Sequence, residues 1–442
     1  MIKAIKKFTE EFLKQIKDKP VRIISHYDTD GISSAAIVGK ALQRIDKKFS
    51  IRIVKGLDKE IINQELKRNG REVLLFTDLA SGSLDYFQNL KNPIFILDHH
   101  EINKQKLKKV KQNVRIINPH LFGNEETCGA GICYFFAKAI SPDNVDLAKL
   151  AVIGIIGDRQ ENNLSKFNQQ IIKEAKELII KKGLLIFSAT RPLKYSLEYS
   201  TSIYIPGVTG SSIGVVELLR ETRIDPNKTL YELSDEEMSR LITAILVKRA
   251  SYDKKEEIVG NIYLLKFFNQ LEDVRELSVL INACSRLGYP DIALSFCLEN
   301  ERAKQEAQEI YIRYKQELIS ALREVEKINK IEGNGFVIIN AKDKIKDTII
   351  GTICSILSSS LNYESGTILI GMAYNGDKIK VSARIAGHDS KNLKEILERV
   401  VVNLEAEVGG HQRAAGCLIR KQDEEKFLEA LKRNLEVEIV KI

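Results

Sequence analysis

Short apolar runs alternate with amphipathic segments along the first third of the chain. Helical spacing of apolar residues marks residues 1–18 and most of the gaps between the later runs. Five of the apolar runs have the length and composition of β-strands: Val21–Ile24, Ile51–Val54, Val73–Phe76, Ile94–Leu97 and Val114–Ile117. Strands separated by helices are typical of a parallel sheet covered on both faces. The pattern therefore predicts a doubly wound α/β domain.

A different pattern follows in the second half of the chain. Residues 291–328 contain neither Gly nor Pro, and their apolar positions are spaced alternately by four and three, which predicts one long amphipathic helix. A Gly-Asn-Gly break at 333–335 ends it. Beyond the break we expect a smaller α/β domain, with strands at Phe336–Ile339, Thr367–Ala373, Lys378–Ile385, Cys417–Arg420 and Val437–Val440.

These patterns divide the chain into four predicted segments. The α/β core occupies 1–185, an insertion or extension of it 186–290, a connecting helix 291–330, and a smaller C-terminal domain 331–442. The insertion is the least legible part. Its polar, Gly-rich stretch 201–212 and the stretch 282–290 read either as connecting loops or as the lining of a substrate channel.

Composition narrows the class of protein. The 442 residues are 44% hydrophobic and 29% charged, with a net charge of +8 that is compatible with nucleic acid without demanding it. No apolar run approaches the length of a membrane span, so no membrane association is expected. The six cysteines form no Cys-x-x-Cys pair, which indicates neither a disulfide framework nor a zinc site and fits a reducing cytoplasm.

Acidic residues and histidines gather where the predicted strands end. Each alone reads as a turn or helix-capping residue. The set consists of His26, Asp28 and Asp30 after the first run, Asp78 after the third, Asp98, His99 and His100 after the fourth, and Asp158 after a helix-like apolar stretch. Carboxyl ends of parallel strands meet at one edge of a sheet, where ligands bind. A divalent cation there would remove the repulsion between neighbouring carboxylates. The set favours a metal site.

This ordered set resembles the DHH phosphoesterase superfamily. The C-terminal stretch Gly409-Gly410-His411-x-x-Ala414-Ala415-Gly416 is similar to the module that usually follows the DHH domain. The chain length, the insertion, Gly157-Asp158-Arg159-Gln160 and Asn282-Ala-Cys-x-Arg-Leu-Gly look most like archaeal RecJ-like exonucleases.

The resemblance implies a role for each member of the set. The implied ligands of two divalent cations are His26, Asp28, Asp30, Asp78, His99 and Asp158, with Asp78 bridging. Mixed Asp/His ligation favours Mn²⁺, with Mg²⁺ as the alternative. Asp98 would orient a ligating imidazole, and His100 would contact the phosphate or stabilise the leaving group. The implied substrate-binding residues are Arg384, Gly409, Gly410, His411 and Arg159.

The implied function is a single-strand-specific exonuclease that releases nucleoside monophosphates. Digestion of DNA in the 5′–3′ direction is one option and RNA is another substrate, and the sequence leaves both the polarity and the preference for DNA or RNA open. One alternative is a phosphodiesterase for oligoribonucleotides or cyclic dinucleotides, although such enzymes usually lack a large insertion. Another is a replisome scaffold bound to GINS or other replication proteins, with incidental nuclease activity. No acid or imidazole of the metal set is missing, which argues against inactivated relatives that serve only as scaffolds.

Overall fold

The computed structural model describes residues 1–67, 71–102, 104–123, 126–186, 188–200, 203–249, 258–360, 363–387, 390–404, 406 and 408–440. The chain divides into two compact units. The first comprises 1–198, 212–244 and 258–311, and the second comprises 199–211, 245–257 and 312–442.

A five-stranded parallel sheet organises the first unit. Its order is β2-β1-β3-β4-β5, and every pairing within it is parallel. The strands are β1 (Val21–His26), β2 (Phe49–Val54), β3 (Val73–Thr77), β4 (Ile94–Leu97) and β5 (Val114–Ile117). All five apolar runs are therefore strands, and the predicted α/β fold class is confirmed.

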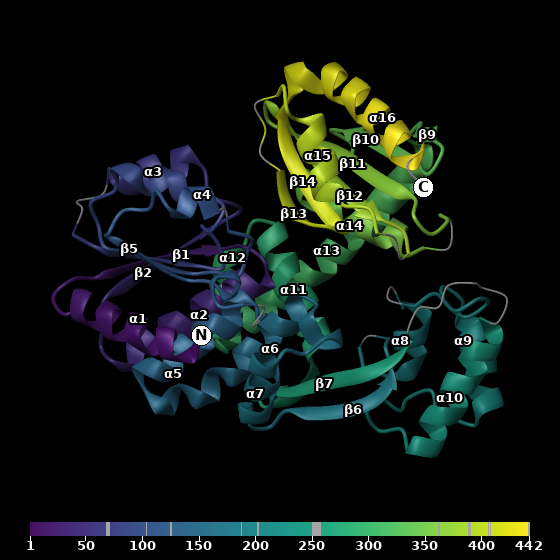
Figure 1. Cartoon of the computed structure of the whole chain (residues 1–442). Helices are drawn as coiled ribbons and strands as arrows, with labels where there is room; N and C mark the ends of the chain where they lie inside the picture. The colour runs from purple at the N-terminus through teal and green to yellow at the C-terminus, as the bar shows by residue number, and fades with distance from the viewer. Residues whose placement is uncertain are drawn as a thin grey trace. The chain divides into compact units, whose positions relative to one another are not determined.

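Helices cover both faces of this sheet, as Figure 1 shows. On one face lie α1 (Ile2–Gln15), α2 (Thr29–Arg44) and α5 (Gly129–Ile140), which pack on one another and on the strands. On the other face, α3 (Lys59–Leu66) and the short α4 (Lys104–Leu107) accompany the 3₁₀ turn 84–89. Two helices continue the chain, α6 (Ala148–Gly157) and α7 (Lys166–Glu174). The central strands are buried on both faces, which is why they read as continuous apolar runs.

A small antiparallel sheet, missed in the sequence, follows the parallel one. Its strands are β6 (Ile179–Leu184), β7 (Val259–Phe267) and β8 (Gln270–Asp273), in that order. Between and after them lie α8 (Leu193–Glu198), α9 (Ser212–Thr222), α10 (Asp235–Lys248), α11 (Val274–Arg286) and α12 (Pro290–Cys297). Helix α11 packs against α2 and α6, which brings a late part of the chain to the edge of the parallel sheet.

The predicted helix over 291–328 is wrong as a single element. The structure has α12, then a turn at 298–300, then α13 (Glu301–Lys327). Glu299 adopts a left-handed backbone with φ of 57°, which ends the first helix. The Asn300 side chain then accepts the backbone N–H of Arg302 at 3.0 Å and so begins the second helix. Helix propensity alone does not reveal such a break.

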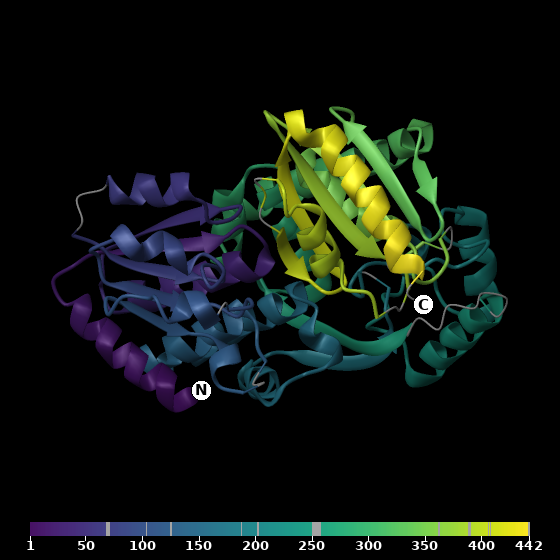
Figure 2. The ribbon, with the colours of Figure 1, turned by 45° about the horizontal axis from the view of Figure 1, so that its top comes forward.

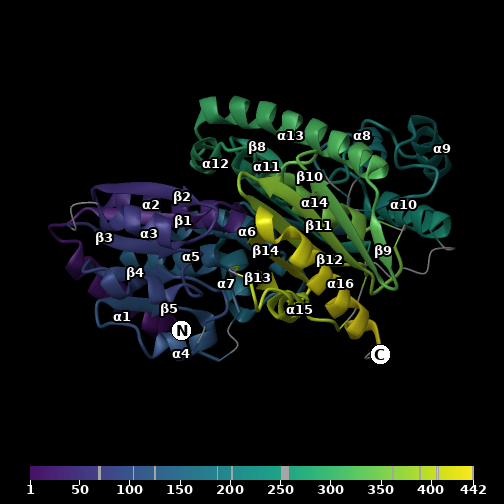
Figure 3. The same ribbon diagram turned by 90° about the horizontal axis from the view of Figure 1, so that it is seen from above.

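The second unit contains a six-stranded sheet of order β13-β14-β12-β11-β10-β9. Its strands are β9 (Ile331–Gly333), β10 (Phe336–Lys342), β11 (Ile368–Asn375), β12 (Lys378–Ile385), β13 (Val408–His411) and β14 (Ala414–Arg420). Two helices, α15 (Leu393–Val400) and α16 (Glu424–Val440), lie on one face of it, as the yellow ribbon of Figure 2 and the labels of Figure 3 show. Their apolar residues belong to the buried core of this sheet. Helix α14 (Asp347–Ser358) packs on β11 and β12.

The strand predicted at Val437–Val440 is wrong, because α16 continues to Val440. Its buried positions Phe427, Leu431 and Leu435 recur every four residues, and no Gly or Pro follows them to stop the helix. Within the described ranges, no helix is both long and apolar enough to cross a membrane. The four predicted segment boundaries stay predictions.

Candidate metal centre

The ends of three adjacent strands carry the cluster predicted from sequence. Strands β1, β3 and β4 are neighbours in the sheet, so the residues after them meet at one edge. Among the described residues, three overlapping groups place one donor atom of each member within 4.8 Å of the others: Asp78–His99–His100, His26–Asp28–Asp78, and Asp30–His99–Asp158. The structure therefore brings together all six predicted ligands together with His100.

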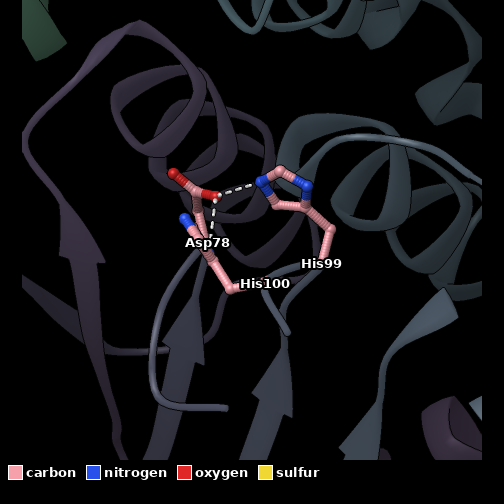
Figure 4. Close-up of side chains that lie close together, drawn as sticks. All are labelled: Asp78, His99 and His100. Atoms are coloured by element: carbon pink, nitrogen blue, oxygen red, sulfur yellow. Dashed lines mark ion pairs between the residues drawn. The ribbon is translucent and has the colours of Figure 1, made fainter. Parts of the chain in front are cut away.

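Asp78 lies at the centre of this cluster. Its carboxylate is 1% exposed, and its backbone adopts φ of 57°, which turns the chain sharply after β3. Oδ1 lies 3.2 Å from Nε2 of His99 and 3.9 Å from Nδ1 of His100, so both imidazoles approach one oxygen (Figure 4). Oδ2 lies 3.6 Å from Nδ1 of His26. Among the described residues, neither carboxylate oxygen of Asp78 has a hydrogen-bond partner, nor does Nδ1 of His26, although all three atoms are buried. Buried oxygen and nitrogen atoms without hydrogen-bond partners are suited to bind divalent cations between them.

Asp28 and Asp30 are each held by a helix. Asp28 caps α2, because its Oδ1 accepts the N–H of Gly31 at 3.0 Å, while its Oδ2 lies 3.0 Å from Nδ1 of His26. Asp30 is buried, and its two oxygens accept the N–H groups of Gly129 and Ala130 at 2.7 and 2.8 Å. The start of α5 therefore binds the carboxylate of Asp30 through its backbone N–H groups.

Asp98 organises the loop that carries the two histidines. It is fully buried and accepts the N–H groups of Ser81 and His99 at 2.8 Å each. Its Oδ1 also lies 2.8 Å from Nδ1 of His100, which fixes that ring. Burial alone would raise the pKa of Asp98, but the imidazole of His100 outweighs it and holds that pKa well below its usual range. Asp98 therefore stays ionised and orients His100.

Burial and neighbouring charges shift the pKa values of the carboxylates and imidazoles in the cluster. Burial, and after it the charge of Asp78, raises the pKa of Asp30 well above its usual value. Burial likewise raises the pKa of Asp158. Burial would lower the pKa of His99, but its contact with Asp78 raises it instead. Carboxylates that resist ionisation beside imidazoles that retain protons are typical of a ligand set that a cation would balance.

Three protein-family domains match successive segments of this chain. Residues 20–155 match the DHH family, N-terminal domain, 186–260 the DHH-CID domain, and 333–437 the DHHA1 domain. The uncharacterised protein MJ0831 of Methanocaldococcus jannaschii is 31% identical over 97% of this chain and 96% of its own. This chain belongs to the DHH superfamily.

Two solved structures share the fold of this DHH protein. RecJ of Thermus thermophilus, in complex with Mn²⁺, superimposes with a TM-score of 0.62 at 17% identity over 98% of this chain. This chain spans about half of that one, 54% of its length. Cdc45 of Entamoeba histolytica superimposes with a TM-score of 0.67 at 13% identity, over 98% of this chain and 99% of its own. The DHH protein is therefore RecJ-like in fold.

The position of the loop that carries Asp28 and Asp30 depends on residues that the sequence analysis did not assign. The backbone N–H of Thr29, between Asp28 and Asp30, donates to Oδ1 of Asn282 on α11 at 3.1 Å. The Thr29 hydroxyl donates to the Ser278 carbonyl at 2.8 Å. The signal was present, since Asn282 opens the stretch singled out above, but its partner lies 253 residues earlier.

Asn118 has the same kind of role for the histidine loop of this DHH protein. It is fully buried, and its amide donates to the hydroxyl of Ser81 and to the carbonyl of His100 at 2.8 Å each. Asp158 follows α6, with its Oδ2 3.8 Å from Nδ1 of His99. Arg159, next to it, is exposed and adopts φ of 57°.

The other predicted substrate-binding residues lie in the second unit. Arg384 of β12 is in register with Ala414 of β14, which is in register with His411 of β13. The Arg384 side chain is positioned by its Nε, which donates to the Ser355 hydroxyl at 2.9 Å. The side chain of His411 lies outside the part of the chain that the structure describes.

Gly409 and Gly410 belong to β13, the edge strand of that sheet, and differ in what surrounds them. Gly410 has φ of 113°, and a Cβ there would meet the carbonyl oxygen of Ala414 at 2.3 Å, so only glycine fits. A Cβ at Gly409 would meet nothing within 4 Å. The backbone at Gly409 is therefore accessible to a close ligand.

Proposed function

We propose that this DHH protein is a metal-dependent exonuclease that hydrolyses single-stranded nucleic acid from an end and releases nucleoside monophosphates. The observation that carries the proposal is the cluster of overlapping donor groups, two of which share Asp78. Two cations held there would polarise the phosphate and lower the pKa of a bound water. The RecJ-like fold supports phosphodiester hydrolysis as the reaction.

The proposed ligands divide between two sites. His26, Asp28 and Asp78 would hold one cation, and Asp30, His99 and Asp158 would hold the other together with Asp78. Four carboxylates then balance the four positive charges of two divalent cations. RecJ of Thermus thermophilus was solved with Mn²⁺ and with Mg²⁺. Because imidazole joins the carboxylates in this donor set, we propose Mn²⁺ as the preferred ion.

Residues around the cations would orient the substrate. His100, whose ring is held by Asp98, would donate to the phosphate or to the leaving oxygen. Arg159 would bind the strand beside Asp158. In the second unit, Arg384, Gly409, Gly410 and His411 would bind the terminal nucleotide, because glycine amides approach closely and a guanidinium pairs with phosphate through two donors.

Digestion of end-labelled strands tests the proposal. Single-stranded DNA and RNA, labelled at the 5′ or 3′ end, are incubated with the full chain and Mn²⁺. We expect nucleoside monophosphates as the first product, resistance of duplex, and loss of activity in Asp78→Asn. Asp85→Asn is the matched control, since Asp85 follows the same strand but pairs with Lys106 at 2.8 Å. Absence of hydrolysis with either Mn²⁺ or Mg²⁺ would overturn the proposal, and preference for dinucleotides would favour the small-substrate phosphodiesterase.

A second candidate function is a part in a replication assembly, with GINS as the proposed partner. The fold likeness to Cdc45, over 99% of that chain, favours it. Purified GINS mixed with the full chain would form a complex in gel filtration. An Asp78→Asn variant that still forms this complex would separate assembly from hydrolysis.

A further inference from the structure

A hydrogen-bonded chain of uncharged side chains leads away from Asp158. Oδ2 of Asp158 accepts a hydrogen bond from Nε2 of Gln160 at 2.7 Å. Oε1 of Gln160 accepts from Nδ2 of Asn168 at 2.8 Å, and Oδ1 of Asn168 accepts from the hydroxyl of Thr127 at 2.7 Å. The chain links the turn after α6 to the first turn of α7 and to the residue before Cys128, which caps α5.

The polarity of this chain is set by chemistry. A carboxylate only accepts, so Gln160 must turn its NH₂ group towards Asp158 and its carbonyl away. That carbonyl needs a donor, and the NH₂ group of Asn168 supplies it. The carbonyl of Asn168 then faces the Thr127 hydroxyl, which can donate. Each amide therefore holds the next one in the single orientation that presents a donor to Asp158.

Burial and close packing restrict the side chains of this hydrogen-bonded chain. Asn168 and Thr127 are each 1% exposed, so water does not replace a missing partner. The backbone N–H of Asn168 is held by the Ser165 hydroxyl at 3.1 Å, which caps α7. Gly131 lies so close that a Cβ there would meet the Thr127 hydroxyl at 2.1 Å. The end of the chain far from Asp158 is thus anchored in two helix starts.

Asp158 itself has few other constraints. It follows the last residue of α6, where the helix dipole disfavours a negative charge. Across the described ranges, Gln160 is the one side chain that donates a hydrogen bond to its carboxylate. The position of this carboxylate relative to Asp30 and His99 therefore depends on Gln160.

We propose that Gln160 and Asn168 are positioning residues that hold the Asp158 carboxylate in place for the cation it shares with Asp30 and His99. Gln160 acts on the carboxylate directly, and Asn168 acts only through Gln160. The inference rests on the proposed function in that it takes the cluster to be a metal site. It adds that a neutral chain, outside the ligand set, sets the affinity for one of the two cations.

Calorimetric titration of the metal-free full chain with Mn²⁺ alone tests the inference without substrate. Gln160→Met and Asn168→Leu remove the hydrogen bonds without changing the charge. Each is expected to weaken one of the two Mn²⁺ sites about 10- to 100-fold and to leave the other unchanged. Because both act through one chain, Asn168→Leu should add nothing in a Gln160→Met background. Turnover should recover at saturating Mn²⁺.

The matched control is Gln170→Met. Gln170 lies on the same helix and also donates to a carboxylate, Oε1 of Glu174 at 3.0 Å, away from the cluster. It should bind Mn²⁺ like the wild type. Thermal melting without metal establishes whether each variant folds. If Gln160→Met does not fold, Asn168→Leu tests the same expectation of one weakened Mn²⁺ site.

The outcomes separate the two proposals. Wild-type Mn²⁺ affinity in folded Gln160→Met or Asn168→Leu overturns the positioning role alone. Additive losses in the double variant overturn the action of Asn168 through Gln160. A wild-type chain that binds two Mn²⁺ ions but hydrolyses no nucleic acid overturns the proposed exonuclease, while the titration still decides the positioning role.

Discussion

A single methyl group at Gly129 would disturb both halves of the cluster. Gly129 is the first residue of α5, and an ideal Cβ there would lie 2.7 Å from Cβ of Asp78 and 2.8 Å from its Oδ1. The same Cβ would lie 3.0 Å from Oδ2 of Asp30. We therefore expect Gly129→Ala to displace the proposed bridging carboxylate, although Gly129 is not itself a proposed ligand.

The displacement can be sized from these distances. Carbon atoms in contact lie about 3.5–4.0 Å apart, so the methyl group falls short of a normal contact with Asp78 by at least about 0.8 Å. Asp78 is held by its N–H bond to the Leu97 carbonyl at 2.8 Å, so the shift is taken up by the carboxylate and its loop. A misplacement of about 1 Å costs on the order of a hundredfold in rate. We expect turnover to fall by about that factor.

Turnover on labelled single strands and Mn²⁺ titration measure the effect together. The control is Gly56→Ala, since a Cβ at Gly56 would meet nothing within 4 Å. Melting without metal checks that Gly129→Ala folds. Turnover within threefold of the wild type, with an unchanged Mn²⁺ isotherm, would refute the reasoning.

Four further changes probe other parts of the molecule. Asp78→Asn should weaken both Mn²⁺ sites and reduce turnover at least about a thousandfold; calorimetry that finds one site intact would contradict the shared ligand. His100→Ala should lower turnover while the Mn²⁺ isotherm keeps both sites. Arg384→Ala should raise the KM for single strands about 10- to 100-fold and leave hydrolysis of a small activated phosphodiester unchanged, as kinetics would measure. Glu65→Gln should cost about 3 kcal/mol in urea unfolding, because the buried Arg22, 3.3 Å from Glu65, loses its counter-charge.

The parallel sheet and its acidic edge were predictable because both signals are local. A strand buried on both faces reads as an apolar run, and the carboxyl ends of parallel strands meet whatever the loops between them do. The clustering of His26, Asp78 and His99 followed from that rule alone. Their roles as ligands remain predictions.

The residues that support the cluster could not be predicted, because no local pattern marks them. Asn282 and Gln160 are polar residues in helical or turn segments, which read as solvent-facing until a partner is known. Strand β6 was missed because its partner β7 begins only at Val259, after a long insertion. The break at Glu299 carried one usable signal, since Asn300 precedes a helical run and is a favoured capping residue.

The hydrogen bond from Thr29 to Asn282 has a consequence for how the protein is made. When Asp158 leaves the ribosome, every proposed ligand has been synthesised, yet the residue that holds the loop of Asp28 and Asp30 has not. Asn282 follows Asp158 by 124 residues, which corresponds to roughly 6–25 s of translation at about 5–20 residues per second. A nascent chain therefore carries the proposed metal ligands for several seconds before α11 can order the loop of Asp28 and Asp30. Mature geometry at the cluster, on this view, is a late event of biosynthesis, and it reports that most of the polypeptide has been completed.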